Sequence, residues 1–249
     1  MSVYERVRGA VERGERAVVF TVLEGDALGQ KLFVPLDGER EGNAPAGLAE
    51  LAPQLLLGGR SKTIEHEGVR VFADVLGPPP RLLVIGAVDT ADALCRSAGA
   101  LGWHTIVADA RAKFATRERM PHADELLVAW PDEALAQVRP DSATAVVVLT
   151  HDDKFDLPAI AGALETEAFY IGALGSRRNQ ERRRERLVEA GVTEEALERV
   201  SGPCGLDIGA ESPAETAFSM LAEILAVRAG REGGRLRDAK TRIHAGPDL

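Results

Sequence analysis

The amino-acid sequence predicts an α/β protein with a C-terminal Rossmann-like doubly wound parallel sheet and a small mixed α/β N-terminal domain. Three observations lead to this fold class. From residue 81 onward, short apolar runs alternate with helical segments, which is typical of parallel strands buried on both faces. Before residue 77, strand-like runs follow one another in pairs separated by turns, which indicates antiparallel hairpins. Between the two patterns lies Gly77-Pro78-Pro79-Pro80, a proline run that favours an extended linker.

The N-terminal domain is expected over residues 1–77, and the linker over residues 78–80. Turn residues indicate where its helices and strands end. Glu24-Gly25-Asp26 interrupts one apolar run, and Gly58-Gly59 ends a helical pattern. The expected elements, in order, are a helix over residues 3–14, a hairpin formed by 16–23 and 28–35, a helix over 46–57, and a second hairpin formed by 61–67 and 69–76 around Gly68.

The C-terminal domain is expected over residues 81–230, followed by a polar, loosely ordered tail over residues 231–249. Its strands are predicted from apolar runs, with a helix that Asp89 caps after the first of them. The predicted strands cover residues 82–87, 105–109, 125–128, 145–150 and 168–171. The predicted helices run from Asp89 through 101, from the fourth strand to 165, and over 180–190, 194–200 and 213–229.

Composition excludes several classes of protein. The formal net charge of the 249 residues is -9, which argues against a general nucleic-acid binder, since such a protein needs a basic face. Cys95 and Cys204 are the two cysteines, and their placement indicates neither a disulfide framework nor a zinc site. We see no signal peptide and no apolar run of membrane-spanning length, so the expected location is the cytoplasm.

The stretch over residues 170–178 predicts an anion site. An apolar strand ends there in small residues, and an arginine-rich helix follows, so backbone N–H groups and cations would face one ligand. The candidate binding residues are Gly172, Gly175, Ser176, Arg177 and Arg178. The later arginines, Arg182, Arg183, Arg184 and Arg186, fit a solvated helix face paired with Glu181 and Glu185.

A second glycine-rich stretch, residues 202–210, contains Asp207 and leads into Ser212-Pro213-Ala214-Glu215. This tetrapeptide is a capping box with proline at the first helical position, so a helix is predicted to start at Pro213. We expect the two helix starts to converge on one ligand, with Asp207 and Ser212 as further candidates. Cys204 in this loop is either a reactive thiolate that carries sulfur or an apolar filler, and the filler is favoured.

Four candidates follow predicted strands, so they share the rim where ligands bind in doubly wound sheets: Gly86, Asp109, His151 and Gly172. His151 would hydrogen-bond a polar heterocycle or carry a proton, or it is an exposed turn residue next to a helix cap. Asp109 lies where an acid that binds a ribose would lie in a dinucleotide fold. Val88 and Asp89, however, occupy the part of the first turn that must approach a pyrophosphate, so nicotinamide binding is disfavoured.

These motifs together resemble the XdhC/CoxI family. The matching segments are residues 109–111, 150–152, 170–178, 205–210 and 212–215, and the resemblance covers residues 81–230. It implies a non-catalytic accessory protein that binds molybdenum cofactor, supports its sulfuration with a cysteine desulfurase, and hands it to an apo molybdenum hydroxylase such as xanthine dehydrogenase or carbon monoxide dehydrogenase. It also implies a homodimer. The phosphate of the cofactor would suit the turn before Arg178, and its polar ring would suit His151 or Asp207.

The chain differs from the family pattern at several places. Val88 and Asp89 replace a glycine and a histidine of the first turn, and Ser201 stands where the family carries a histidine. Two glycine-containing motifs of the family's N-terminal domain are also absent from residues 25–29 and 57–60. Two other hypotheses therefore remain, namely an oxidoreductase that uses a nicotinamide dinucleotide, and a family member that has lost its ligand and acts only as an assembly partner.

Overall fold

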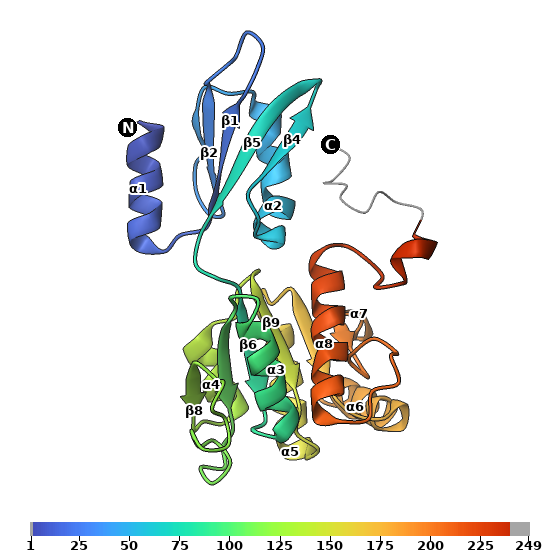
Figure 1. The fold of residues 1–249 in the computed structure, drawn as a ribbon. Coiled ribbons are helices and arrows are strands. Elements are labelled where there is room, and N and C mark those ends of the chain that lie inside the picture. Colours follow the sequence, from blue (N-terminus) through green and yellow to red (C-terminus); the bar gives the residue numbers. More distant parts are fainter. Residues whose placement is uncertain (1, 240–249) are drawn as a thin grey trace. The chain divides into compact units, whose positions relative to one another are not determined.

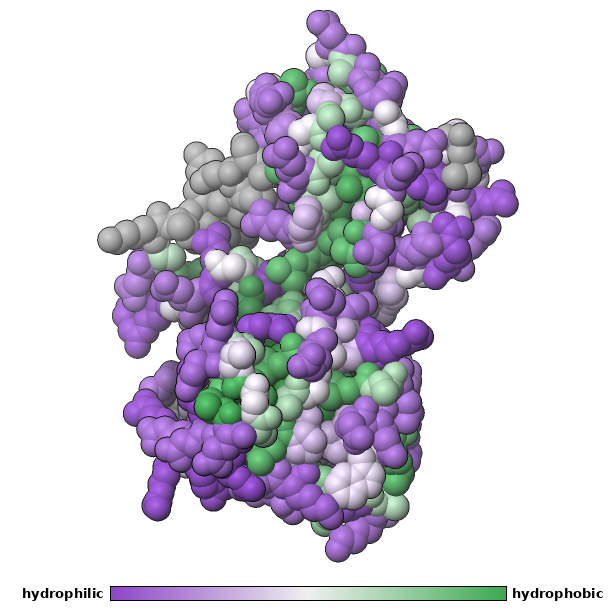
Figure 2. All heavy atoms as spheres, turned by 180° about the vertical axis from the view of Figure 1, so that it is seen from behind, coloured by the Kyte–Doolittle hydropathy of each residue, from purple (hydrophilic) through white to green (hydrophobic). Residues whose placement is uncertain are grey.

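The computed structural model describes residues 2–239 and divides the chain into two compact units (Figure 1). Of the described residues, one unit comprises 2–79 together with 234–239, and the other comprises Pro80–Gly233. Each unit has its own sheet and its own buried clusters. In the view of Figure 2, hydrophilic residues cover most of the outer surface of both units.

The first unit is an antiparallel sheet of strand order β3-β2-β1-β5-β4. One face packs on η1 and α2 through a cluster that includes Phe20, Leu48 and Leu55, and the other face packs on α1 through Ala10 and Phe33. Its elements are α1 (Val3–Arg13), β1 (Ala17–Val22), β2 (Lys31–Pro35), β3 (Glu41–Gly42), η1 (Ala46–Leu51), α2 (Ala52–Gly58), β4 (Lys62–His66) and β5 (Val69–Leu76).

Both predicted hairpins of this unit are present, but the single helix predicted over residues 46–57 is wrong. The segment forms the 3₁₀ helix η1 and then the α-helix α2, in which Pro53 lies in the first turn. A proline in that position lacks the N–H that a continuous helix would need and crowds the preceding turn, so the helix begins anew there.

The second unit is a parallel sheet of strand order β11-β10-β9-β6-β7-β8, so the predicted α/β fold class is confirmed. Its elements are β6 (Arg81–Ile85), α3 (Asp89–Gly99), β7 (His104–Ala108), β8 (Glu125–Leu127), α4 (Pro131–Val138), β9 (Thr144–Val148), α5 (Asp153–Leu164), β10 (Tyr170–Ala173), α6 (Arg177–Glu189), α7 (Glu194–Leu197), β11 (Val200–Ser201) and α8 (Pro213–Arg228).

Alternate residues of each buried strand point to opposite faces of this sheet. Leu82, Val84 and Val147 pack with α3 and α8, which lie side by side in Figure 1, and Leu83, Ile85 and neighbouring residues pack with α4, α5, α6 and α7. This two-sided coverage explains why the strands are continuously apolar. The sheet is therefore the rigid layer from which the loops at its carboxyl edge extend.

Several local predictions differ from the structure. The helix predicted over 180–190 begins earlier, at Arg177, because Ser176 caps it. Asp89 is the first residue of α3, and Val88 is its N-cap, without a side-chain capping bond. The helix predicted over 194–200 ends at Leu197, because Val200 and Ser201 instead pair with β10 as the short edge strand β11. The predicted tail contains the 3₁₀ helix η2 (Leu236–Asp238), and its part beyond residue 239 lies outside the described residues.

Candidate functional site

The carboxyl edge of the parallel sheet carries most of the predicted site residues. Gly86 directly follows β6, Asp109 directly follows β7, and His151 follows shortly after β9 ends. The strand order reverses between β6 and β9, which is the place where doubly wound sheets open a crevice for ligands. Helices α3, α6 and α8 all begin at this edge (Figure 1).

The sequence predicts Gly172 in the turn after β10, and this placement is wrong. The residue lies inside β10 and is buried. A Cβ atom at this position would come within 2.7 Å of the Tyr170 ring, so the glycine makes room for that ring. The requirement for glycine here is one of packing, and the turn before α6 is formed by Leu174 and Gly175 instead.

Asp109 is buried, and both oxygens of its carboxylate accept hydrogen bonds from residues of the same unit. One carboxylate oxygen accepts hydrogen bonds from the backbone N–H and Nε of Arg111 at 2.9 and 2.8 Å, and the other accepts from the N–H of Ala87 and Nη2 of Arg111 at 2.9 and 2.8 Å. Burial alone would raise the pKa of Asp109, but Arg111 and the N–H of Ala87 outweigh it and hold the pKa below its usual range. The carboxylate therefore fixes the turn after β6 and orients Arg111.

The helix α6 is tied to α5 by a buried ion pair. Arg183 contacts Asp156, whose other oxygen accepts a hydrogen bond from Thr150, and both charged side chains are almost fully buried. Burial raises the pKa of Asp156, and Thr150 and Arg183 oppose that rise in part. Nη1 of Arg183 also donates to the carbonyl of Leu174 at 2.9 Å, which holds the turn before α6.

The predicted pairing of the α6 arginines with Glu181 and Glu185 is therefore wrong. Arg182 and Arg186 both pair with Asp153 at the start of α5, and Arg184 pairs with Glu194 and Glu198. These partners lie at the start of α5, in α7 and directly after α7, so the polar residues of α6 reach across to neighbouring elements. Arg183 belongs to the interior, and the other three arginines form bridges at the surface.

The start of α6 is the place where the sequence predicts an anion site. Ser176 is the N-cap and accepts a hydrogen bond from the N–H of Asn179 at 3.2 Å. Arg177 and Arg178 are the first residues of the helix, and both are exposed. Among the described residues they form no ion pair, so their charges face solvent at the positive end of the helix dipole.

The second glycine-rich loop is tied to α8. Glu223 accepts hydrogen bonds from the Tyr170 hydroxyl and from the N–H of Gly205 at 2.8 Å, and Ser219 donates to the carbonyl of Leu206 at 2.6 Å. Asp207 lies in the exposed part of this loop. The predicted capping box at the start of α8 is present, with Ser212 as the N-cap. That α6 and α8 converge on one ligand stays a prediction.

The two cysteine thiols are buried, and burial raises the pKa of each to about 12. We expect Cys95 and Cys204 to react with a thiol reagent at pH 8 only slowly in the native protein and rapidly after denaturation, since the thiolate is the reacting form. A time course with and without denaturant measures this. Rapid modification of Cys204 in the native protein would contradict its burial and revive the interpretation of this residue as a sulfur carrier.

A group of aromatic rings and cations on the rim is not predicted by the sequence. The ring of Phe155 lies 5.2 Å from that of Trp130, and the guanidinium of Arg111 lies 4.3 Å from the ring of Phe114 and 5.4 Å from that of Phe155. Lys154 lies 4.6 Å from the Trp130 ring. These residues come from three separate segments of the sequence, residues 111–114, 130 and 154–155, and only Arg111 belongs to a motif that the sequence singles out. Their proximity depends on the order of the strands.

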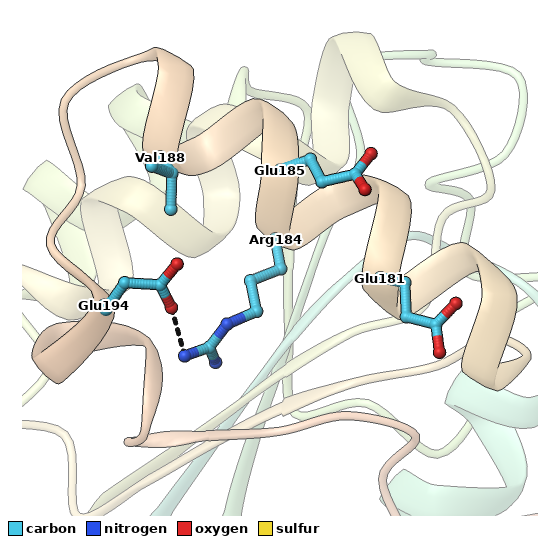
Figure 3. A pocket seen from close by; sticks show the side chains of 5 residues that line it. All are labelled: Glu181, Arg184, Glu185, Val188 and Glu194. Atoms are coloured by element: carbon cyan, nitrogen blue, oxygen red, sulfur yellow. Dashed lines mark ion pairs between the residues drawn. The ribbon is translucent and has the colours of Figure 1, made fainter.

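A shallow hollow of about 420 Å³ lies away from this rim, along α6 and α7 (Figure 3). Glu181, Arg184, Glu185, Val188 and Glu194 line it, and Arg184 pairs with Glu194 across it. Three of the four charged side chains are acidic, so the hollow suits an anion poorly. It is therefore not the anion site that the sequence predicts.

Several known proteins are similar to this chain in sequence. The model of the family described as the XdhC Rossmann domain matches residues 82–224. The chain is 37% identical over 167 residues to the "Uncharacterized protein YqeB" of Escherichia coli K12, and 34% identical over 158 residues to a probable xanthine dehydrogenase subunit of Bacillus subtilis 168. It is 38% identical over 103 residues to the "Molybdenum cofactor insertion chaperone PaoD" of Escherichia coli K12.

The alignments cover 66%, 64% and 41% of this chain, but only 30%, 46% and 32% of those three relatives in the same order. The chain thus spans less than half the length of each. A crystal structure described as a xanthine dehydrogenase from Bacillus halodurans is similar in fold, with a TM-score of 0.65 and 24% identity. The superposition covers 90% of this chain and 65% of that one. None of the described helices is both long enough and apolar enough to cross a bilayer.

Proposed function

We propose that this chain, which belongs to the XdhC family, is a non-catalytic accessory protein that binds molybdenum cofactor and assists its insertion into a molybdenum hydroxylase. The observation that carries the proposal is the exposed helix start at Ser176–Arg178, on the ligand-binding edge of the sheet, in a chain similar to an insertion chaperone. Exposed cations beside the N–H groups of a helix start suit the phosphate of a pyranopterin. Because the chain as a whole has a net charge of -9, the two exposed arginines at this helix start stand out from its overall negative charge.

The remaining rim residues complete the proposed site. Gly175, which has a positive φ of 143°, lets the backbone turn into α6, and Ser212 begins α8 at the same edge. His151 and Asp207 are exposed and carry the polar groups that would hydrogen-bond the ring of the cofactor. Gly86 and Asp109 shape the floor of the site, because Asp109 holds the turn after β6.

The finer steps of the proposed function come from the resemblance to the family. Sulfuration of the cofactor would need sulfur from a cysteine desulfurase, since both thiols of this chain are buried. Delivery would take place in the cytoplasm, to the apo form of an enzyme of the xanthine dehydrogenase or carbon monoxide dehydrogenase type. A homodimer would present two such sites. A nicotinamide-dependent activity has less support, because all four lone pairs of Asp109 are already engaged.

The proposal is tested by purifying the protein from a host that makes molybdenum cofactor and assaying the fluorescent pterin that oxidation releases. We expect about one pterin per chain. No pterin, even after loading in vitro, combined with tight binding to a molybdenum hydroxylase, would instead favour an assembly partner that has lost its ligand.

The double substitution R177A/R178A is expected to weaken pterin retention at least about tenfold, because it removes charge-assisted hydrogen bonds to the phosphate that are worth roughly 1.5–3 kcal/mol each. Since both side chains are exposed, the free energy of unfolding should change by less than about 0.5 kcal/mol. Equilibrium dialysis against released cofactor measures the retention.

Arg182→Ala is the matched control on the same helix, because Arg182 is exposed but pairs with Asp153. It should keep the retention of the wild type. Equal losses in the control and in the double variant would show that the helix contributes only a diffuse charge, and unchanged retention in the double variant would remove the anion site from α6.

A further inference from the structure

A small hollow lies at the carboxyl ends of β6, β7 and β9. Gly86, Asp109, Ala129, Thr150 and Phe155 are among the residues that line it. In a dinucleotide-binding Rossmann fold, this is where the nucleoside lies, next to the acid that follows the second strand. The room left in the hollow is about 10 Å³, which is close to the least that one water molecule needs. A nucleobase therefore does not fit beside these side chains.

Phe155 is the side chain that occupies this place. The residue is only 9% exposed, and its ring packs against Trp130 at 5.2 Å, while Arg111 lies over the ring at 5.4 Å and Lys154 at 5.8 Å. Asp109 holds Arg111 in that position through its side-chain hydrogen bonds. The ring is thus fixed from several sides, and a nucleobase would have to displace the ring together with its neighbours.

A second observation, independent of the volume, concerns hydrogen bonding. The carboxylate of Asp109 accepts two hydrogen bonds on each oxygen, so it has no lone pair left for the hydroxyl groups of a ribose. One of those bonds uses the N–H of Ala87, in the turn that would otherwise face a pyrophosphate. Both the base and the sugar of a nucleoside therefore lack a place at this half of the crevice.

We infer that Phe155 closes the nucleoside half of the crevice, so that this chain takes molybdenum cofactor in the form that carries no added nucleotide. The inference rests on the proposed function. A ligand that spans both halves of the crevice is excluded, and the half at the start of α6 receives the phosphate of the pterin. Phe155 is therefore a residue that determines which form of the cofactor is bound.

The first test analyses the protein purified from a host that makes both forms of the cofactor. Acid hydrolysis releases one nucleoside monophosphate per pterin from the dinucleotide form and none from the other. We expect pterin without nucleotide. An equimolar nucleotide would overturn the inference while leaving the proposed function intact. An absence of pterin would count against the proposed function, and the second test would then decide the inference alone.

The second test is calorimetric titration with ADP and CDP, as a purine and a pyrimidine probe. The wild type should show no saturable binding up to about 1 mM, and Phe155→Ala should bind at least one probe about tenfold more tightly or better. Phe155→Val serves if the alanine variant does not fold. Phe169→Ala is the matched control, because Phe169 packs against Trp103 and precedes β10 at the opposite end of the sheet. Binding by the wild type, or no gain on opening the hollow, would overturn the inference.

Discussion

Replacing Asp156 by alanine is expected to lower the free energy of unfolding of the C-terminal unit by roughly 3–5 kcal/mol, because it leaves the guanidinium of Arg183 buried without its counter-charge. The hydroxyl of Thr150 loses its acceptor in the same step. Urea unfolding followed by tryptophan fluorescence measures the change, since Trp103 and Trp130 both lie in this unit.

Asp153→Ala is the control for this prediction. Asp153 also pairs with arginines of α6, but those partners, Arg182 and Arg186, are exposed, so its removal should cost only about 1 kcal/mol or less. A similar cost for both substitutions would mean that burial does not distinguish the two ion pairs. Asp156→Asn separates charge from shape, because the amide keeps the volume and one acceptor.

Gly86→Ala is expected to destabilise the same unit by roughly 2–6 kcal/mol, as the sum of backbone strain and overpacking. The residue has a φ of 114°, a backbone conformation that only glycine adopts without strain. A Cβ atom there would lie 2.7 Å from the side chain of Thr150 and 3.0 Å from its backbone nitrogen. Thr150 follows shortly after β9, a central strand, so its backbone cannot move away easily without disturbing the sheet. The midpoint of urea unfolding measures the effect.

Gly99→Ala is the control for this prediction. The substitution is chemically the same, but it is expected to stabilise the protein. Gly99 is the last residue of α3, and a Cβ atom there would meet nothing within 4 Å. Alanine should stabilise the helix by about 0.5–1 kcal/mol. If Gly86→Ala were as mild as this control, the close approach of the turn to Thr150 would not be a constraint on the sequence.

Much of the fold follows from the sequence because its signals are local or periodic. The continuously apolar runs around Val84 and Val147 predict parallel strands covered on both faces, and the structure buries both residues completely. The capping box at Ser212 predicts the start of α8 at the residue where it occurs. Such signals need only a few neighbouring residues, so one chain is sufficient to read them.

The site is less predictable because its contacts join residues far apart in the sequence. Arg183 looks like its neighbouring arginines at helical spacing, and its partner Asp156 lies on another helix. The sequence does hold one signal, since Arg183 and the buried Leu187 are four residues apart and therefore share a helix face. For Asp109, the position can be predicted from the sequence but the contacts cannot. Its bonds to Arg111 and Ala87 depend on how the chain folds around it.

The separate buried clusters of the two units affect how any stability measurement on this chain is interpreted. The clusters around Leu82 and Leu83 lie within one unit, and those around Phe20 and Ala10 lie within the other. A chain built in this way need not melt in one step, so a single melting temperature is not a defined property of the whole chain. Tryptophan emission does not report on the unfolding of the N-terminal unit, because that unit contains no tryptophan. Heat capacity, in contrast, records the unfolding of both units.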